Sequence, residues 1–215
     1  MLNPYHDRLR SAIRGKTIIY IDAANLERSV KAMWVNPKDI PDALKKYTAD
    51  ALCWRVDYKK MKDFFTTLCD LVTVRFYSAH FGSGSHNNFL SLLKQGLGFA
   101  LKTKALKEYK DHTDEQPHRK ANFDVEIAVD ATYTLNTYIT LILFSGDSDF
   151  AYLLRFLRGQ NKTTIVFSRS GHVAKELPPA SSHYFDLIDF RQDLLRIELR
   201  KQKIPRERDS AVDNR

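Results

Sequence analysis

The segment Ile139-Thr-Leu-Ile-Leu-Phe-Ser-Gly-Asp-Ser-Asp-Phe150 joins the most apolar run of the chain to an acidic turn. Short runs of β-branched and other apolar residues are typical of strands buried in a parallel sheet. The glycine and the aspartates that follow favour a turn, and the residues from there to Arg158 predict a helix. We therefore expect a strand, a turn and a helix in succession, with Asp147 and Asp149 where the strand ends.

The same succession is predicted near the N-terminus. Lys16-Thr-Ile-Ile-Tyr-Ile-Asp22 is a second apolar run that ends in an acid, and residues 25–33 predict the helix after it. Further strands are expected at 71–77, 98–109, 162–168 and 184–188, and further helices at 58–68, 82–95, 123–135, 173–177 and from 189 onward. Strands that alternate with helices predict an α/β fold, in which helices cover both faces of a parallel sheet. Ligands bind such sheets beyond the carboxyl ends of the strands.

The chain has 215 residues, which suits a single α/β domain. We assign residues 1–195 to this domain and residues 196–215 to a charged C-terminal tail. Residues 34–55 interrupt the alternating pattern with two prolines and two tryptophans, and we interpret them as an insertion that acts as a lid or contact surface. Trp34 and Trp54 favour packing over the core, with contact across a homodimer as the alternative.

The composition disfavours several classes of protein. No apolar run reaches the length of about 20 residues needed to span a bilayer, so no membrane association is expected. The N-terminal residues lack the apolar segment of a secretory signal, which predicts a cytoplasmic protein. Cys53 and Cys69 show no metal-binding spacing and no histidines form an HExxH pattern, so a zinc site is not expected. The net charge of +8 favours a polyanionic partner.

Acidic residues occur at three places that this topology brings to one edge of the sheet. Asp22 ends the first strand, Asp147 and Asp149 follow the central strand, and Asp124 lies in the first turn of the preceding helix. Carboxylates gathered there repel one another unless a cation neutralises them, and hard oxygen ligands suit Mg²⁺ or Mn²⁺. Such a site can activate water for phosphodiester cleavage. Helix capping is the alternative role for Asp124 and Asp149, and a solvated helix face is the alternative for Asp130.

Three motifs resemble those of NYN domains, the PIN-like group that includes the LabA/DUF88 proteins. In the family's order they are Ile21-Asp-Ala-Ala-Asn-Leu26, Phe123-Asp-Val-Glu-Ile-Ala-Val-Asp130 and Phe144-Ser-Gly-Asp-Ser-Asp-Phe150. The resemblance extends over roughly residues 16 to 190, and the third motif is the most specific. It implies a PIN-like, Rossmannoid sheet and a metal-dependent ribonuclease.

The resemblance also implies roles for individual residues. It implies a metal-binding core of acids, namely Asp22, Asp124 and Asp147, with Asp149 in support. It implies a surrounding set of polar residues, namely Asn25, Ser145 and Asp130. In this scheme the asparagine joins the three core acids as a catalytic residue that orients the first acid or a bound water. The serine adds a hydroxyl to the same network, and the last aspartate matches an acidic position of the helix motif.

Basic residues lead toward the helix that begins near Asp124. They predict a path for the RNA backbone, with contacts from Lys104, Lys107, Arg119 and Lys120. The acids between them favour a solvated surface as the alternative, and residues 110–120 predict a loop. Many family members carry Lys-Gly-Val before the central aspartate, where this chain has Ala121-Asn122-Phe123. A lysine that contacts phosphate is therefore displaced here or replaced by Arg119.

Together these patterns predict a metal-dependent endoribonuclease that acts on single-stranded RNA. A catalytically weak or inactive module that binds RNA or a protein partner is the alternative. Gly82-Ser-Gly-Ser-His-Asn87 lacks the third glycine of a dinucleotide-binding fingerprint, which disfavours that function. Ala24 stands where a phosphatase of the haloacid dehalogenase type needs its second aspartate, which disfavours that enzyme class as well.

Overall fold

The structure is a computed structural model of the chain, and it describes residues 4–105, 107–109, 118–120 and 122–200. Between residues 106 and 121 only the backbone of the two short segments is described. No helix within these ranges is long and apolar enough to cross a bilayer.

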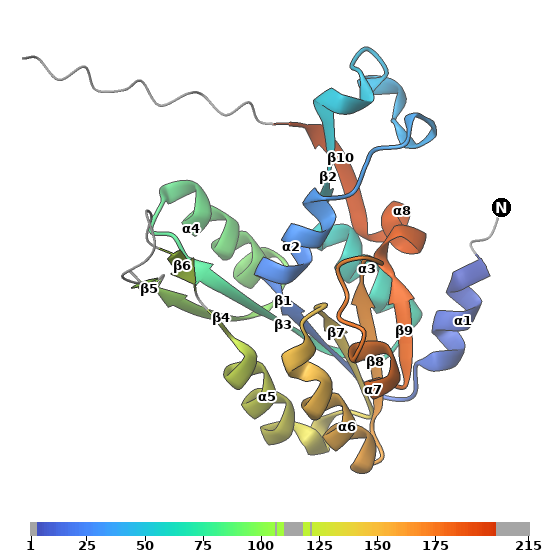
Figure 1. The fold of residues 1–215 in the computed structure, drawn as a ribbon, viewed down its shortest axis with the longest axis vertical. Coiled ribbons are helices and arrows are strands. Elements are labelled where there is room, and N and C mark those ends of the chain that lie inside the picture. The colour runs from blue at the N-terminus through green and yellow to red at the C-terminus, as the bar shows by residue number, and fades with distance from the viewer. Residues whose placement is uncertain (1–3, 106, 110–117, 121, 201–215) are drawn as a thin grey trace, which may run out of the picture.

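A six-stranded sheet forms the centre of the molecule (Figure 1). Its strands are β1 (Thr17–Asp22), β3 (Leu71–His80), β4 (Ala100–Ala105), β7 (Thr140–Phe144), β8 (Thr163–Ser168) and β9 (His183–Asp186). They lie in the order β4-β3-β1-β7-β8-β9, and every neighbouring pair is parallel. The predicted α/β fold with a parallel sheet is therefore confirmed.

The strand order reverses at the centre of the sheet. From β1 the chain builds outward through β3 to β4, and it then returns to place β7, β8 and β9 on the other side of β1. β1 and β7 are thus neighbours. The chain leads from β1 toward β3 on one side of the sheet, and from β7 toward β8 on the other. In an open parallel sheet, this reversal leaves a crevice at the carboxyl edge where ligands bind.

Helices cover both faces of the sheet (Figure 1). They are α1 (Pro4–Ala12), α2 (Ala23–Lys31), α3 (Tyr58–Leu68), α4 (Gly84–Ser91), α5 (Asp124–Tyr133), α6 (Ala151–Gly159), α7 (Leu177–Ala180) and α8 (Arg191–Leu194). Ile19 and Ile21 of β1 pack in a core cluster with residues of α2 and α3, while Ile18 and Tyr20 pack in a second cluster with residues of α5 and α6. Because both faces of β1 are buried, its sequence is an unbroken apolar run rather than an alternating one.

Three of the predicted local elements are wrong. The helix expected from 189 onward ends at Leu194, because the chain then forms a strand that pairs with residues 52–56. The helix expected at 173–177 begins at Leu177 instead, because the prolines at 178 and 179 suit the first turn of a helix and fix its start. The loop expected at 110–120 ends early, since His118–Lys120 forms strand β6 and pairs with β5 (Lys107–Tyr109). Residues 110–117 lie outside the described part of the chain.

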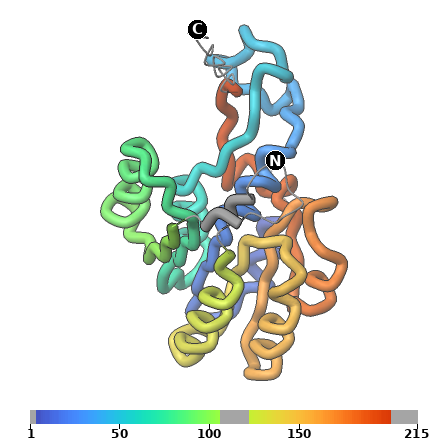
Figure 2. The backbone as a smooth tube through the Cα atoms, turned by 60° about the vertical axis from the view of Figure 1, so that its left-hand side comes forward, coloured from blue at the N-terminus to red at the C-terminus, as the bar shows by residue number. Residues whose placement is uncertain are grey.

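The predicted insertion forms an arm that projects from the body of the domain (Figures 1 and 2). We define the arm as residues 34–56 together with strand β10 (Leu195–Leu199). It contains 3-10 turns at Pro37–Asp39, Asp42–Leu44 and Ala49–Ala51, followed by strand β2 (Leu52–Val56), which pairs antiparallel with β10. The charged tail predicted from residue 196 therefore does not begin there, because residues 196–199 belong to this strand.

The two tryptophans of the arm have different environments. Trp54 is only 2% exposed, and its indole Nε1 donates a hydrogen bond to the carbonyl oxygen of Trp34 at 3.3 Å. The side chain of Trp34 itself is 60% exposed. Packing over the core is thus confirmed for Trp54 and wrong for Trp34.

Candidate active site at the carboxyl edge of the sheet

Asp22 is the last residue of β1 and also the residue that caps α2. Its carboxylate accepts a hydrogen bond from the backbone nitrogen of Asn25 at 3.2 Å and another from the hydroxyl of Ser145 at 3.1 Å. The side-chain oxygen of Asn25 in turn accepts a bond from the backbone nitrogen of Gly146 at 2.8 Å. These bonds join the end of β1 to the loop after β7, across the reversal in strand order.

Asp147 follows β7 and caps the 3-10 turn Ser148–Phe150. Its carboxylate accepts a hydrogen bond from the backbone nitrogen of Asp149 at 3.2 Å, and its own backbone nitrogen donates to the hydroxyl of Ser145 at 3.3 Å. The serine hydroxyl thus contacts both Asp22 and the Asp147 backbone. The structure therefore places Ser145 and Asn25 between the two strand ends.

Asp124 approaches the same place from α5. It is the first residue of that helix, its backbone nitrogen donates to the side chain of Asn122 at 3.0 Å, and α5 packs beside the turn Ser148–Phe150. Burial is the main reason why the pKa of Asp124 lies above its ordinary value, and the charges of Asp147, Asp149 and Asp22 raise it further. We call these four residues the acid cluster: Asp22, Asp124, Asp147 and Asp149.

The acid cluster holds more negative charge than its surroundings neutralise. Burial raises the pKa of Asp22, and the charge of Asp147 adds to the increase, although hydrogen bonds from Asn25 and Ser145 partly offset it. Raised carboxyl pKa values mean that the ionised forms are disfavoured. A bound divalent cation would stabilise the ionised forms and lower these pKa values again. The donor set, all carboxylate and hydroxyl oxygen, is the type that Mg²⁺ and Mn²⁺ prefer.

The spacing of the acid cluster is looser than that of a complete metal site. Within the described ranges, no three His, Cys, Asp or Glu side chains are close enough together to hold an ion by themselves. The carboxylates therefore influence one another through charge without converging on one point. Mg²⁺ usually retains several waters in its coordination shell, so a loosely spaced set of carboxylates fits it.

Comparison with known proteins identifies the family. The sequence pattern of the NYN domain matches residues 16–189. This chain belongs to the NYN domain family. It is 31% identical over 148 residues to the low amplitude and bright protein LabA of Synechococcus elongatus, and the alignment covers 67% of this chain and 79% of LabA. A protein of unknown function from Vibrio parahaemolyticus has a similar fold, with a TM-score of 0.62 and 19% identity over 85% of this chain and 97% of its own.

Membership in the NYN family confirms the predicted resemblance and agrees with the PIN-like parallel sheet. The match extends over the whole acid cluster, since Asp22 and Asp149 both lie between its ends. NYN domains belong to the PIN-like nucleases, so the family supports a role in nuclease or RNA-related chemistry. The roles of individual residues in this NYN domain stay predictions.

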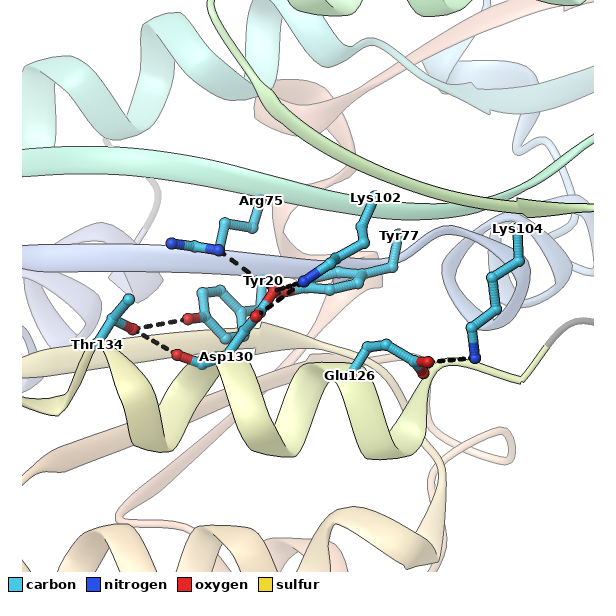
Figure 3. Close-up of polar contacts among 8 residues, drawn as sticks. All are labelled: Tyr20, Arg75, Tyr77, Lys102, Lys104, Glu126, Asp130 and Thr134. Atoms are coloured by element: carbon cyan, nitrogen blue, oxygen red, sulfur yellow. Dashed lines mark hydrogen bonds and ion pairs between the residues drawn. The ribbon is translucent and has the colours of Figure 1, made fainter.

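Asp130 lies further along α5 in a separate polar network (Figure 3). Its carboxylate accepts hydrogen bonds from the Tyr77 hydroxyl at 2.9 Å, Lys102 Nζ at 3.0 Å and Arg75 Nη1 at 3.2 Å. The residue is only 8% exposed, so the solvated helix face considered for it is wrong. Since Tyr77 and Arg75 lie on β3 and Lys102 on β4, the network ties α5 to these strands and so positions the start of the helix, where Asp124 lies.

Asp130→Asn is expected to lower the free energy of unfolding by about 1–2 kcal/mol near neutral pH, because charge-assisted hydrogen bonds from the partly exposed Lys102 and Arg75 are lost. Burial raises the pKa of Asp130, but bonds from Lys102 and Tyr77 outweigh it and bring the pKa below its ordinary 3.8. A lowered carboxyl pKa stabilises the fold above pH 3.8, and this contribution is lost as the pH falls further. Urea unfolding at neutral and acidic pH measures the difference.

The matched control for this substitution is Asp63→Asn. Asp63 forms an exposed ion pair with Lys59 one turn away on α3, and such pairs contribute little to stability. If the loss of stability in Asp130→Asn were the same at neutral pH and below the carboxyl pKa, the ion pairs of Asp130 would not be its cause.

Of the predicted RNA contacts, the structure describes the side chain of Lys104 alone. Its Nζ forms an ion pair with Glu126, donates to the carbonyl oxygen of Asn122 at 3.0 Å and lies 5.1 Å from the centre of the Phe123 ring. The lysine thus lies against the segment that leads into α5. The side chains of Lys107, Arg119 and Lys120 lie outside the described residues.

Sequence reasoning missed the close packing around Gly146. A Cβ atom on this residue would lie 2.1 Å from the carbonyl oxygen of His172 and 2.6 Å from the hydroxyl of Ser168. The glycine between Ser145 and Asp147 in the third motif was the available signal for such a contact. The Asp130 network had no equivalent signal, because its partners come from two separate strands.

Proposed function

We propose that this NYN domain is a metal-dependent endoribonuclease that cuts single-stranded RNA at the acid cluster. The observation that carries the proposal is the gathering of four carboxylates, two of them with raised pKa values, where the strand order reverses. A folded protein retains such mutual repulsion most readily where a cation or a reaction uses it. Family membership supports the same conclusion.

In this proposal Asp22, Asp124 and Asp147 hold Mg²⁺ or Mn²⁺, and Asp149 supports them. A bound divalent ion supplies Lewis acidity to the scissile phosphate and activates water. The protein's own part is to orient the ligands: Asn25 and Ser145 fix the Asp22 carboxylate through the bonds described above. Phosphate contacts from Lys104, Lys107, Arg119 and Lys120 would hold the RNA backbone beside the cluster.

The proposal is tested by incubating the full chain with end-labelled single-stranded RNA and, alongside it, DNA of matching sequence. Each strand is incubated with Mn²⁺, with Mg²⁺ or with EDTA. Internal cleavage of RNA that requires metal is the expected result. Binding without cleavage under every metal condition would contradict the proposed nuclease activity and favour the alternative, an RNA-binding module.

Metal is also expected to stabilise the fold. An ion that binds only the native state raises the free energy of unfolding by about 2.7 kcal/mol at 100 times its dissociation constant. We expect Mn²⁺ to raise the thermal midpoint of the wild type and of Asp63→Asn, and to have much less effect on Asp22→Asn. An equal shift in all three proteins, measured by calorimetry, would place the bound ion elsewhere.

A further inference from the structure

A cleft of about 390 Å³ lies between the domain and the arm. α2, the β2–β10 pair, the end of β3 and α4 line it. Its α2 wall begins with Ala23 and Ala24, the two residues that follow Asp22. The cleft therefore runs along α2 from the end next to Asp22 to the opposite end at Lys31, and it exists because the insertion folds back to pair with β10.

Two arginines face each other on the arm side of the cleft. Arg55 of β2 and Arg196 of β10 are direct partners in the antiparallel register and both line the cleft. Like charges opposite each other on two strands are destabilising. Glu198 at 2.6 Å and Asp57 at 3.9 Å compensate Arg196, whereas Arg55 has no ion-pair or hydrogen-bond partner among the described residues. Arg55 is therefore able to attract an anion.

The two acids that line the cleft do not cancel this attraction, since both have other partners. Glu27 pairs with Lys31 at 3.3 Å and lies 3.5 Å from the Tyr58 hydroxyl, and Glu198 pairs with Arg196. The Arg55 guanidinium is left as the cation available to a ligand.

The opposite wall carries an exposed aromatic ring. Phe81, just beyond β3, is 58% exposed and lines the cleft. It lies edge to face with His86 of α4, with ring centres 4.8 Å apart. Nε2 of His86 lies 3.1 Å from the carbonyl oxygen of Ala79, and this contact fixes the orientation of the imidazole ring that packs against Phe81. Such a held but uncovered ring is suited to stack a nucleobase.

We propose that the cleft binds one nucleotide of the RNA strand, next to the phosphate that lies at the acid cluster. The phosphate of this nucleotide is bound by Arg55, and its base stacks on Phe81. The inference rests on the proposed function, because the acid cluster places the rest of the strand. It gives the insertion a role, because the arm supplies Arg55, a phosphate contact that the domain alone lacks.

Binding is measured separately from cleavage, by fluorescence anisotropy of labelled oligouridylate with the full chain in EDTA. Phe81→Ala is expected to weaken binding about tenfold, because stacking is lost, with an unchanged dependence on salt. Arg55→Ala is expected to weaken binding and to reduce the slope of log affinity against log salt by about 0.7, because one phosphate contact is lost. Tyr152→Ala and Arg10→Ala, which remove exposed residues of the same kinds on α6 and α1, serve as matched controls.

The outcomes for the cleft and for the nuclease are distinguishable. The cleft proposal would be contradicted if both cleft variants kept the wild-type affinity and salt slope, or if the wild type bound no RNA. This holds whether or not metal-dependent cleavage is found. If binding were lost only in the cleft variants and no metal gave cleavage, the proposed nucleotide site would stand and the proposed nuclease activity would be contradicted. Circular dichroism and thermal midpoints of each variant confirm that it is folded.

Discussion

Asp147→Asn is expected to reduce metal-dependent RNA cleavage by about a hundredfold or more, since a metal ligand contributes several kcal/mol to the transition state. Asparagine keeps the size of the side chain and an oxygen that can accept the bond from the Asp149 backbone nitrogen, now at 3.2 Å. The turn after β7 should therefore form as before. The free energy of unfolding without metal should be unchanged or higher, because one repelling charge is removed from the acid cluster.

The measurement is the initial rate of RNA cleavage in Mn²⁺, together with urea unfolding in EDTA. The control is Asp42→Asn, in the arm, whose carboxylate is 93% exposed and pairs only with Lys45 within the described chain. This control should cut at the wild-type rate. A wild-type rate in Asp147→Asn would remove this residue from the active site, and equal loss in both variants would show that general charge is responsible.

Gly146→Ala is expected to lower the free energy of unfolding by about 3 kcal/mol, at the upper end for overpacking of a tight site. The added methyl group would lie 2.1 Å from the backbone carbonyl oxygen of His172, which cannot move aside as a flexible side chain could. The loop after β7 must then shift. The bond from the Gly146 backbone nitrogen to Asn25 lies in that loop, so the acid cluster is displaced and cleavage should fall as well.

The matched control for this prediction is Gly159→Ala at the end of α6. A Cβ there would meet no atom within 4 Å, and alanine favours helix, so stability should be equal or slightly higher. Thermal and urea unfolding of both variants measure the difference. If Gly146→Ala unfolded at the wild-type urea concentration, the close approach of Gly146 to His172 would not exist in solution.

The sequence by itself determined the parallel sheet and the position of most candidate site residues along it. Both faces of β1 and β7 are buried, so each strand is a continuous apolar run, and such a run is a local signal. Once the strands were known, the ends of β1 and β7 had to meet at one edge. Asp22 ends the first of those runs and Asp147 lies three residues after the second, so the two acids could be placed together without a structure.

Only the tertiary structure decided which distant segments pair. The strands β2 and β10 lie far apart in the sequence, and neither carries a local signal for its partner. For the same reason the cleft residues Arg55 and Phe81 and the contacts of Asp130 could not be predicted. Strand and helix patterns depend on neighbouring residues, whereas these contacts depend on side chains brought together by burial from elsewhere in the chain.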